Sequence, residues 1–160
     1  MGFLAEEKTV EKRLLSEIKR SRVLLESALL DSGVAVSQQD LKLRYTHFWN
    51  AHRGMAGEEL IGKTDADWLP TGEAAKLTAI KKRALEGKKG VREMFKSTLN
   101  GGHEGDVYFN DIRVEPIFED GQVVGIYTVA IDITEFHKAL AKLEELNGRL
   151  LKHMETQLDS

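Results

Sequence analysis

Two tight turns constrain the fold of this chain more than any other feature of its sequence. Asn100–Gly101 and Asp120–Gly121 are dipeptides that readily adopt the positive φ angles of short hairpin loops. The segments around them, Val91–Leu99, His103–Phe118 and Gln122–Ile133, alternate apolar and polar residues with the period of two that is typical of strands. Strands joined by such short turns pair in the antiparallel sense. The second half of the chain therefore predicts a three-stranded antiparallel meander.

A second antiparallel pair is predicted earlier in the chain. Gly33–Ser37 is a short strand candidate, Gln38–Asp40 a turn, and Leu41–Asn50 a longer strand rich in aromatic and branched residues. Alternation predicts two faces for the longer strand, one with Tyr45, His47 and Trp49 and the other with Thr46, Phe48 and Asn50. In the fourth strand the same rule sets Tyr108, Asn110, Ile112 and Val114 against Phe109, Asp111 and Arg113.

Between the two groups of strands the period becomes helical. Ala56–Gly62 and Thr64–Pro70 each predict a short turn of helix, and Thr71 offers an N-cap side chain for a longer helix that runs to Glu86 and stops at Gly87. Its apolar face is predicted to hold Ala74, Leu77, Ile80 and Ala84. The basic residues Lys76, Lys81, Lys82 and Arg83, with Lys88 and Lys89, are expected on a solvated face and not as a nucleic-acid patch.

Long amphipathic helices are predicted at both ends of the chain. Glu6–Leu30 contains neither glycine nor proline, and the apolar residues Leu4, Leu14, Ile18, Leu25 and Ala28 follow a partial heptad. In Thr134–Leu158 the a and d positions hold Leu140, Leu143, Leu150 and Met154, with the polar Asn147 at the intervening a position. A helix of 25 residues extends about 37 Å, which is more than a small domain needs for its own core. We therefore expect both helices to find partners in a homodimer.

The order of strands, helices and strands, together with several short motifs, resembles the PAS domains of bacterial sensory histidine kinases. The motifs are Asp40–Thr46 with Asn50, Glu59–Asp67, Leu69–Pro70, Val114–Pro116, Gly121–Gly125 and Asp132–Thr134, and the resemblance covers roughly residues 28 to 136. It implies an α+β fold with a five-stranded antiparallel sheet and helices on one face. Long coiled-coil-prone helices at the N- and C-termini complete the expected architecture.

The resemblance also implies a role in signal transduction. We expect residues 1–30 to form a signalling and dimerisation helix, residues 31–134 a PAS sensor domain, and residues 135–160 a coiled-coil-prone output helix. Such a module binds a small molecule or a partner and relays the change through a homodimer to a downstream output domain or kinase. The alternative is a structural PAS domain that dimerises or docks a protein without any ligand. No paired carboxylates, nucleophile–base pair or phosphate loop suggests an enzyme.

The composition argues against several cofactors. The chain contains no cysteine, which argues against disulfides, cysteine-ligated metals and flavin chemistry that requires a cysteine adduct. Haem-binding PAS domains generally ligate iron through a histidine on the long helix before the third strand, and Thr71–Glu86 contains none. His47 and His52 lie near each other in sequence, but no carboxylate or cysteine completes a metal motif. His153 departs from phosphoacceptor patterns, which predicts an ordinary solvent-facing histidine.

Nine residues stand out as candidates for binding or relay. The ligand candidates are Tyr45, Asn50, His52, Trp68, Tyr108 and Arg113, and the relay candidates at the exit of the domain are Asp132, Thr134 and Asn147. Among the ligand candidates, Asn50, His52 and Arg113 are donors that would suit a small carboxylate or a purine. We expect the identity of the cofactor, if there is one, to lie outside haem and cysteine-adduct flavin.

Charge and hydropathy predict where the chain acts. The net charge is −3, so no global basic field attracts nucleic acid or anionic lipid. No apolar stretch approaches the roughly 20 residues that span a bilayer. A cytoplasmic location without membrane or nucleic-acid partners is therefore expected.

Overall fold

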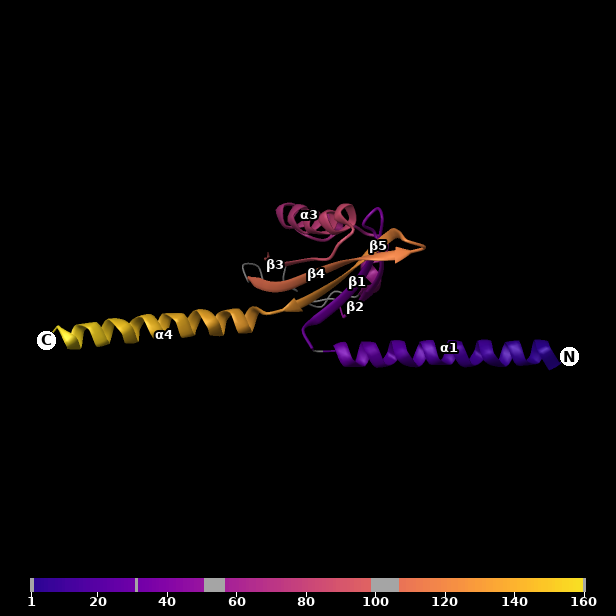
Figure 1. The fold of residues 1–160 in the computed structure, drawn as a ribbon, viewed down its shortest axis with the longest axis horizontal. Helices are drawn as coiled ribbons and strands as arrows, with labels where there is room; N and C mark the ends of the chain where they lie inside the picture. Colours follow the sequence, from indigo (N-terminus) through magenta and orange to yellow (C-terminus); the bar gives the residue numbers. More distant parts are fainter. Residues whose placement is uncertain (1, 31, 51–56, 99–106, 160) are drawn as a thin grey trace.

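The computed structural model describes residues 2–30, 32–50, 57–98 and 107–159 (Figure 1). In chain order the helices are α1 (Gly2–Leu29), α2 (Gly57–Leu60), a 3₁₀ turn η1 (Asp65–Asp67), α3 (Thr71–Gly87) and α4 (Thr134–Leu158). The strands are β1 (Val34–Asp40), β2 (Tyr45–Trp49), β3 (Val91–Ser97), β4 (Tyr108–Glu119) and β5 (Gln122–Asp132).

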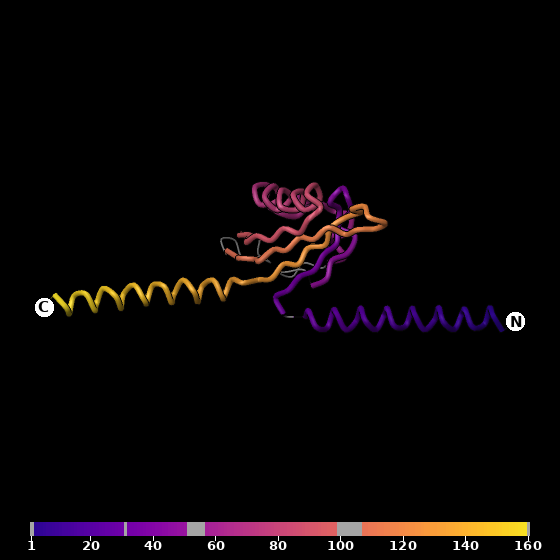
Figure 2. The backbone as a smooth tube through the Cα atoms, viewed as in Figure 1, coloured from indigo at the N-terminus to yellow at the C-terminus, as the bar shows by residue number. Residues whose placement is uncertain are grey.

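The five strands form one sheet in the order β2-β1-β5-β4-β3, and every neighbouring pair is antiparallel. Figure 1 shows α3 packed over one face of this sheet, while α1 and α4 leave from the other side in opposite directions. The tube in Figure 2 shows that the chain runs in the same direction along both end helices, toward the domain in α1 and away from it in α4. The predicted α+β fold, an antiparallel five-stranded sheet with helices on one face, is confirmed.

The turn between β1 and β2 lies later in the sequence than predicted. Gln38–Asp40 belongs to β1, and the reversal occurs at residues 41–44, where the Asp40 carboxylate accepts backbone hydrogen bonds from Lys42 (2.9 Å) and Arg44 (3.0 Å). Leu43 takes a left-handed φ of 59° there and is nonetheless buried. The side chain of Asp40 therefore builds the turn just beyond the strand, and burial of Leu43 offsets its unfavourable backbone angle.

A β-bulge in β2 overturns the predicted alternation of that strand. Gln38 pairs with His47 whereas the next residue of β1, Gln39, pairs with Tyr45, so Thr46 is an extra residue in the ladder. The bulge brings Tyr45 and Phe48 together, with ring centroids 5.0 Å apart, while His47 stacks on Trp49 at 5.4 Å. A strict period of two fails because one inserted residue reverses the face of everything after it.

The ends of α3 differ by one residue from the prediction. Pro70 occupies the N-cap position and Thr71 is the first helical residue, so Thr71 does not cap the helix. At the other end Gly87 remains helical, and Lys88 takes the left-handed conformation with φ 51°. The Asp120–Gly121 turn is confirmed, with φ values of 50° and 78°. The Asn100–Gly101 turn lies outside the described residues.

The core fills the space between α3 and the sheet. Its buried residues come from all parts of that layer: Leu43, Leu69, Ala74, Leu77, Ile80, Ala84, Phe95, Ile112, Val114 and Ile126. In contrast, α1 has no buried residue, and in α4 only Thr134 is buried. The domain is thus held by one apolar layer, and the two end helices contribute almost nothing to it.

Candidate functional site: a cavity between the sheet and the long helix

A partly open cavity of about 80 Å³ lies between α3 and the sheet. Its floor is made of small side chains on the central strands, Ala35 and Ser37 from β1 and Thr128 and Ala130 from β5. Register places these four residues side by side, because Ala35 pairs with Ala130 and Ser37 with Thr128. Small residues at adjacent inward positions leave the space unfilled.

The other lining residues form the walls of this cavity. They come from strands β2, β3 and β4, from the segment between η1 and α3, and from α3: Tyr45, Phe48, Trp68, Leu69, Leu77, Lys81, Phe95, Ser97, Asn110 and Ile112. The rings of Tyr45, Phe48 and Trp68 meet at tilted or edge-to-face angles with centroids 5.0 to 6.3 Å apart. One side of the cavity is therefore aromatic.

A charged group that the sequence did not predict lies in this wall. Lys81 Nζ donates hydrogen bonds to Asp65 Oδ1 (2.7 Å), Asp65 Oδ2 (2.8 Å) and the Tyr45 hydroxyl (3.1 Å), and that hydroxyl donates to Asp65 Oδ1 (2.5 Å). All three side chains are almost fully buried, with 1%, 2% and 2% of Lys81, Asp65 and Tyr45 exposed. We call Tyr45, Asp65 and Lys81 the buried triad.

The expectation of a solvated basic face is wrong for Lys81. Ala74, Leu77, Lys81 and Ala84 follow one another at spacings of three, four and three, so Lys81 belongs to the buried stripe of α3. Its neighbours Lys82 and Arg83 are exposed as predicted. The position of Lys81 on the apolar stripe of α3 was the signal that could have identified it as buried. Its partner Asp65 lies in a separate 3₁₀ turn, and only the folded structure brings the two side chains together.

Burial shifts the pKa values of Tyr45 and Lys81 in opposite directions. Loss of solvent raises the pKa of Tyr45 well above 10.0, and the neighbouring Asp65 charge and hydrogen bond add to the rise. The same loss of solvent lowers the pKa of Lys81 from 10.5, against the attraction of Asp65. Because the Tyr45 hydroxyl is held protonated, it can donate to Asp65 and accept from Lys81 at the same time.

Three polar atoms that line the cavity have no hydrogen-bond partner among the described residues. They are Asn110 Oδ1, Thr128 Oγ1 and Trp68 Nε1. The side chain of Trp68 lies close enough to the Tyr45 hydroxyl to lower its pKa slightly, but not in hydrogen-bonding geometry. Unpaired buried polar atoms are rare in folded proteins, since each costs about 1–3 kcal/mol. Their clustering here makes the cavity the candidate site for a ligand.

The exit of the domain carries a compact hydrogen-bond network. The Thr134 hydroxyl donates to Asp132 Oδ1 (2.5 Å) and accepts from the Phe109 backbone N–H (3.0 Å), and the Thr134 N–H donates to the same carboxylate (3.0 Å). The Ile133 N–H donates to the Phe109 carbonyl (2.8 Å). The predicted N-cap role of Thr134 is wrong: Ile133 occupies the N-cap position, and the Thr134 hydroxyl bonds β4 instead of its own helix.

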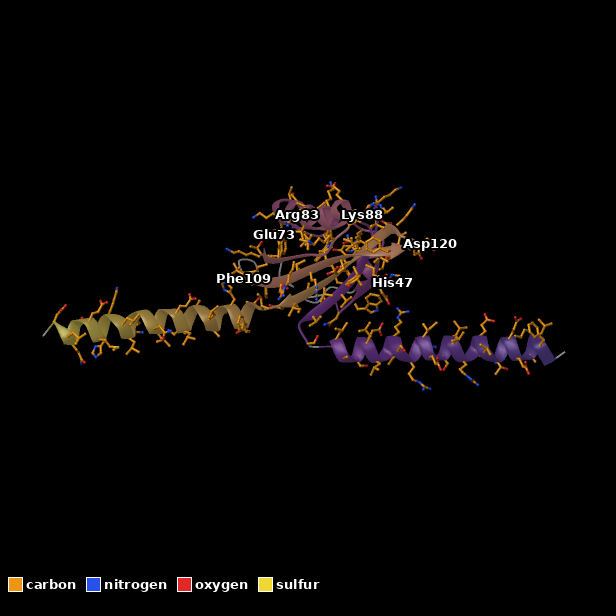
Figure 3. All side chains as sticks on the ribbon, in the orientation of Figure 1. His47, Glu73, Arg83, Lys88, Phe109 and Asp120 are labelled. Atoms are coloured by element: carbon orange, nitrogen blue, oxygen red, sulfur yellow. The ribbon has the colours of Figure 1, made fainter. Side chains whose placement is uncertain are left out.

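His137, which the sequence analysis did not select, completes this corner. Its ring stacks on Phe109 with centroids 3.8 Å apart and an interplanar angle of 8°. Figure 3 shows Phe109 at the end of the sheet from which α4 departs. The first turn of α4 is therefore fixed to β4 through both the backbone and the side chain of Phe109.

The predicted ligand residues do not all reach the cavity. Tyr45 and Trp68 line it, whereas Arg113 is exposed on the opposite face of the sheet, where it pairs with Glu115 at 3.4 Å. Tyr108 lies at the start of β4, outside the lining. His52 lies outside the described residues. The hydrogen-bond donors predicted for a carboxylate or purine ligand are therefore not brought together at this cavity.

Asn50 has a different place. With φ at 53°, its side-chain amide donates to the backbone carbonyls of Leu29 (2.5 Å) and Val34 (2.6 Å). These carbonyls belong to the end of α1 and the start of β1. Asn50 therefore ties the entry of the domain to the end of β2, and does not line the cavity.

The end helices present apolar stripes to solvent. Leu14, Ile18 and Leu25 in α1 are 53%, 64% and 41% exposed, and Leu143 and Leu150 in α4 are 54% and 57% exposed. Asn147 lies in the α4 stripe and is exposed.

Across the described parts of the chain, no helix has the length and apolar character needed to cross a membrane. Those same parts hold no group of three or more metal-binding side chains.

Comparison with known families gives one match over most of the chain. The sequence profile of a family described as the PAS fold matches residues 29–138. Two plant proteins are similar over nearly the whole chain: probable histidine kinase 1 of Oryza sativa subsp. indica (30% identical, 88% of this chain) and histidine kinase 5 of Arabidopsis thaliana (28% identical, 92%). The chain spans only 15% and 16% of the lengths of those relatives.

Solved structures agree on the fold. The PAS domain of Bordetella pertussis BvgS superposes with a TM-score of 0.56 at 22% identity, over 84% of this chain and 98% of that one. An RNA-binding light-oxygen-voltage receptor gives a TM-score of 0.59 at 20% identity, over 79% of this chain and 37% of the receptor. At such identities the likeness concerns the fold alone.

Proposed function

Since the chain belongs to the PAS-fold family and is related to histidine kinases, we propose that it is a ligand-responsive sensory module that signals through its end helices. In this proposal residues 31–134 bind a small molecule in the cavity under α3. Residues 1–30 and 135–160 pair with their counterparts in a homodimer and pass the change to an output domain or kinase. The module itself carries out no chemical reaction.

One observation carries this proposal: the cavity and the exit network share a single peptide. Asn110 lines the cavity, and its neighbour Phe109 bonds both Ile133 and Thr134 through its backbone. Asn110 also pairs with Asp132 across β4 and β5. A ligand that moves Asn110 therefore pulls directly on the first turn of α4, without an intervening loop.

The end of α1 lies next to the same part of the domain as the start of α4. The Asp132 N–H donates to the Gly33 carbonyl at 2.8 Å, and Asn50 bonds the carbonyls of Leu29 and Val34 on either side of it. The end of α1 and the start of α4 are thus joined through one short stretch of backbone. A displacement at this corner reaches both helices together.

Dimerisation supplies the partner that the end helices lack. Each exposes an apolar stripe along its length, and such stripes are normally buried against another chain. Asn147 interrupts the α4 stripe at an a position, where a polar residue fixes register at some cost in stability.

We expect the protein to be a dimer by light scattering at tens of micromolar. Asn147→Leu should raise the melting temperature and alter signalling.

Thr134→Val tests the relay in a full-length protein whose output activity is measured with and without its stimulus. The substitution keeps the shape of the side chain but removes the two hydrogen bonds of its hydroxyl, to Asp132 Oδ1 and from the Phe109 N–H. We expect regulation to be lost while the dimer persists. Thr156→Val is the matched control, because Thr156 lies on the same helix and bonds only the carbonyl of Lys152.

Ala35→Leu tests the sensory part of the same proposal. Leucine at this position fills the floor of the cavity, so the regulated output should become independent of stimulus. An unchanged response in Ala35→Leu would favour the alternative function, a structural PAS domain that dimerises or docks a protein without a ligand.

A further inference from the structure

The charges of the cavity wall cancel one another before any ligand arrives. The three N–H groups of the protonated Lys81 are all used, two on the carboxylate of Asp65 and one on the Tyr45 hydroxyl. The carboxylate accepts from both partners, and the Tyr45 hydroxyl both donates and accepts. The buried triad therefore offers no unused N–H group to an anionic ligand, even though it contains a lysine.

A charged ligand would have to break this arrangement. A buried ion pair deprived of one partner costs several kcal/mol, which exceeds what one new ion pair with a ligand returns. An isolated charge in this cavity would also lose its solvation without compensation. The cavity thus selects against carboxylates, phosphates and ammonium compounds.

The polar atoms of the cavity that still lack a hydrogen-bond partner are uncharged. Asn110 Oδ1 needs a donor, Trp68 Nε1 needs an acceptor, and Thr128 Oγ1 can serve as either. Asn110 and Thr128 are 5% and 6% exposed, so a ligand and not bulk solvent is the natural partner. A ligand with one N–H or O–H group and one acceptor would satisfy them.

The walls and volume limit the rest of the ligand. The rings of Tyr45, Phe48 and Trp68 favour a flat aromatic body, which packs against them in tilted or edge-to-face contacts. The volume of about 80 Å³ is roughly half of the 150 Å³ that admits benzene in an engineered protein cavity. A single ring therefore requires the half-buried Phe48 and Trp68 to move outward, and a fused-ring cofactor does not fit.

We propose that the ligand of this cavity is a small, neutral, single-ring aromatic compound that carries a hydrogen-bond donor and an acceptor. This inference rests on the proposed sensory function and specifies the chemistry of its ligand. The ring lies against Tyr45, Phe48 and Trp68, and its polar group bonds Asn110 together with Thr128 or Trp68. The buried triad stays intact and keeps the site neutral.

Three ligands of one ring size test this proposal by calorimetry and ligand-observed NMR on the whole chain. Phenol carries a neutral donor and acceptor, benzoate adds a negative charge, and toluene has no polar group. We expect phenol to bind at least about tenfold more tightly than either of the others, the ratio that one satisfied buried hydrogen bond supplies.

Variants locate the binding of phenol. Asn110→Ala should weaken it by about tenfold, since its hydrogen bond is lost. Gln122→Ala, which truncates an exposed amide side chain outside the cavity and the end helices, should leave the affinity unchanged. Asn110→Ala removes an atom that has no partner, so the fold should persist, and an unchanged circular dichroism spectrum verifies this.

Other results would overturn the proposal. Benzoate binding as tightly as phenol contradicts the neutrality of the site, and toluene binding as tightly contradicts the role of the polar atoms. If phenol does not bind, yet native mass spectrometry finds a retained charged or larger molecule, the ligand class is wrong and the sensory function stands. The sensory function is tested separately by Ala35→Leu. It fails if the regulated output of that variant is unchanged.

Discussion

The layer between α3 and the sheet has two unlike ends. Toward the β4–β5 turn, Ile126 and Ala84 are fully buried, with no measurable exposure, beside Leu43 and Ile80. Toward the exit of the domain the same layer holds Ala35, Ser37, Thr128 and Asn110 around a cavity. Ile126 and Thr128 are two residues apart on β5 and share the inward face, so one strand contributes to both ends.

The contrast separates stability from responsiveness. At the packed end, branched apolar side chains fill the space, and each contributes the burial free energy that holds the sheet to the helix. At the hollow end, small and polar residues leave room and unpaired hydrogen-bonding atoms. In the proposed function a ligand changes the hollow end, next to the exit helix, while the packed end and the buried triad keep the fold.

Lys81→Ala should produce the largest loss of stability, because it leaves Asp65 buried without its cation. We expect the free energy of unfolding to fall by about 3–5 kcal/mol. The adjacent Lys82 is exposed on the same helix, and Lys82→Ala should change stability by no more than about 0.5 kcal/mol. Denaturant titration of both variants measures the difference.

The outcome of that pair would sharpen the comparison between the ends. A large loss for Lys81→Ala means that the hollow end contains its own charged anchor. Equal, small losses for the two lysines would mean that the packed end alone holds the domain together, contrary to our interpretation.

Ile126→Val and Thr128→Val should shift stability in opposite directions on one strand. Removing a methylene group from the packed end should cost about 0.5–1.5 kcal/mol. Replacing the hydroxyl of Thr128 by a methyl group removes a buried polar atom without a partner among the described residues, and should add about 1 kcal/mol in the ligand-free protein. Thermal unfolding of the two variants measures both changes. A loss of stability in Thr128→Val would contradict the hollow character of that end.

Alkaline pH should give the smallest effect. The pKa of Tyr45 is raised in the fold, mainly by burial and then by Asp65, so its contribution to stability is complete below pH 10 and is lost as the pH rises through the raised value. The lowered pKa of Lys81 acts in the opposite direction, but both the parent and Tyr45→Phe contain it. The stability advantage of the parent over Tyr45→Phe should therefore shrink above pH 10 in denaturant titrations. A constant difference would contradict a protonated Tyr45 within the triad.

Much of the fold could be predicted from local patterns. The alternation in β3, β4 and β5 and the Asp120–Gly121 turn depend on neighbouring residues alone, and these predictions agree with the structure. The bulge at Thr46 was not predictable in this way, because it depends on how β1 and β2 pair. One inserted residue changed which aromatic side chains face the cavity.

The candidate site was less accessible to prediction. Tyr45 and Trp68 were selected as aromatic residues in plausible positions, and both line the cavity. Lys81 was assigned to solvent because its side chain is charged, although its heptad position placed it inward. The sequence also gives no sign that Asp65, sixteen residues earlier, lies opposite it. Buried polar partners of this kind are found only when the separate elements are brought together.

The way α4 is attached gives the domain a mechanical advantage. Only its first turn touches the sheet, through Thr134 and His137, and the remaining helix of this 25-residue element projects freely. At 1.5 Å per residue the part beyond the first turn is an arm of about 32 Å, so a tilt of about 10° at the junction moves its far end by about 5.4 Å, one full helical turn. In the proposed relay, a sub-ångström adjustment in this small cavity would therefore be magnified to a distance over which two paired helices exchange one set of contacts for the next.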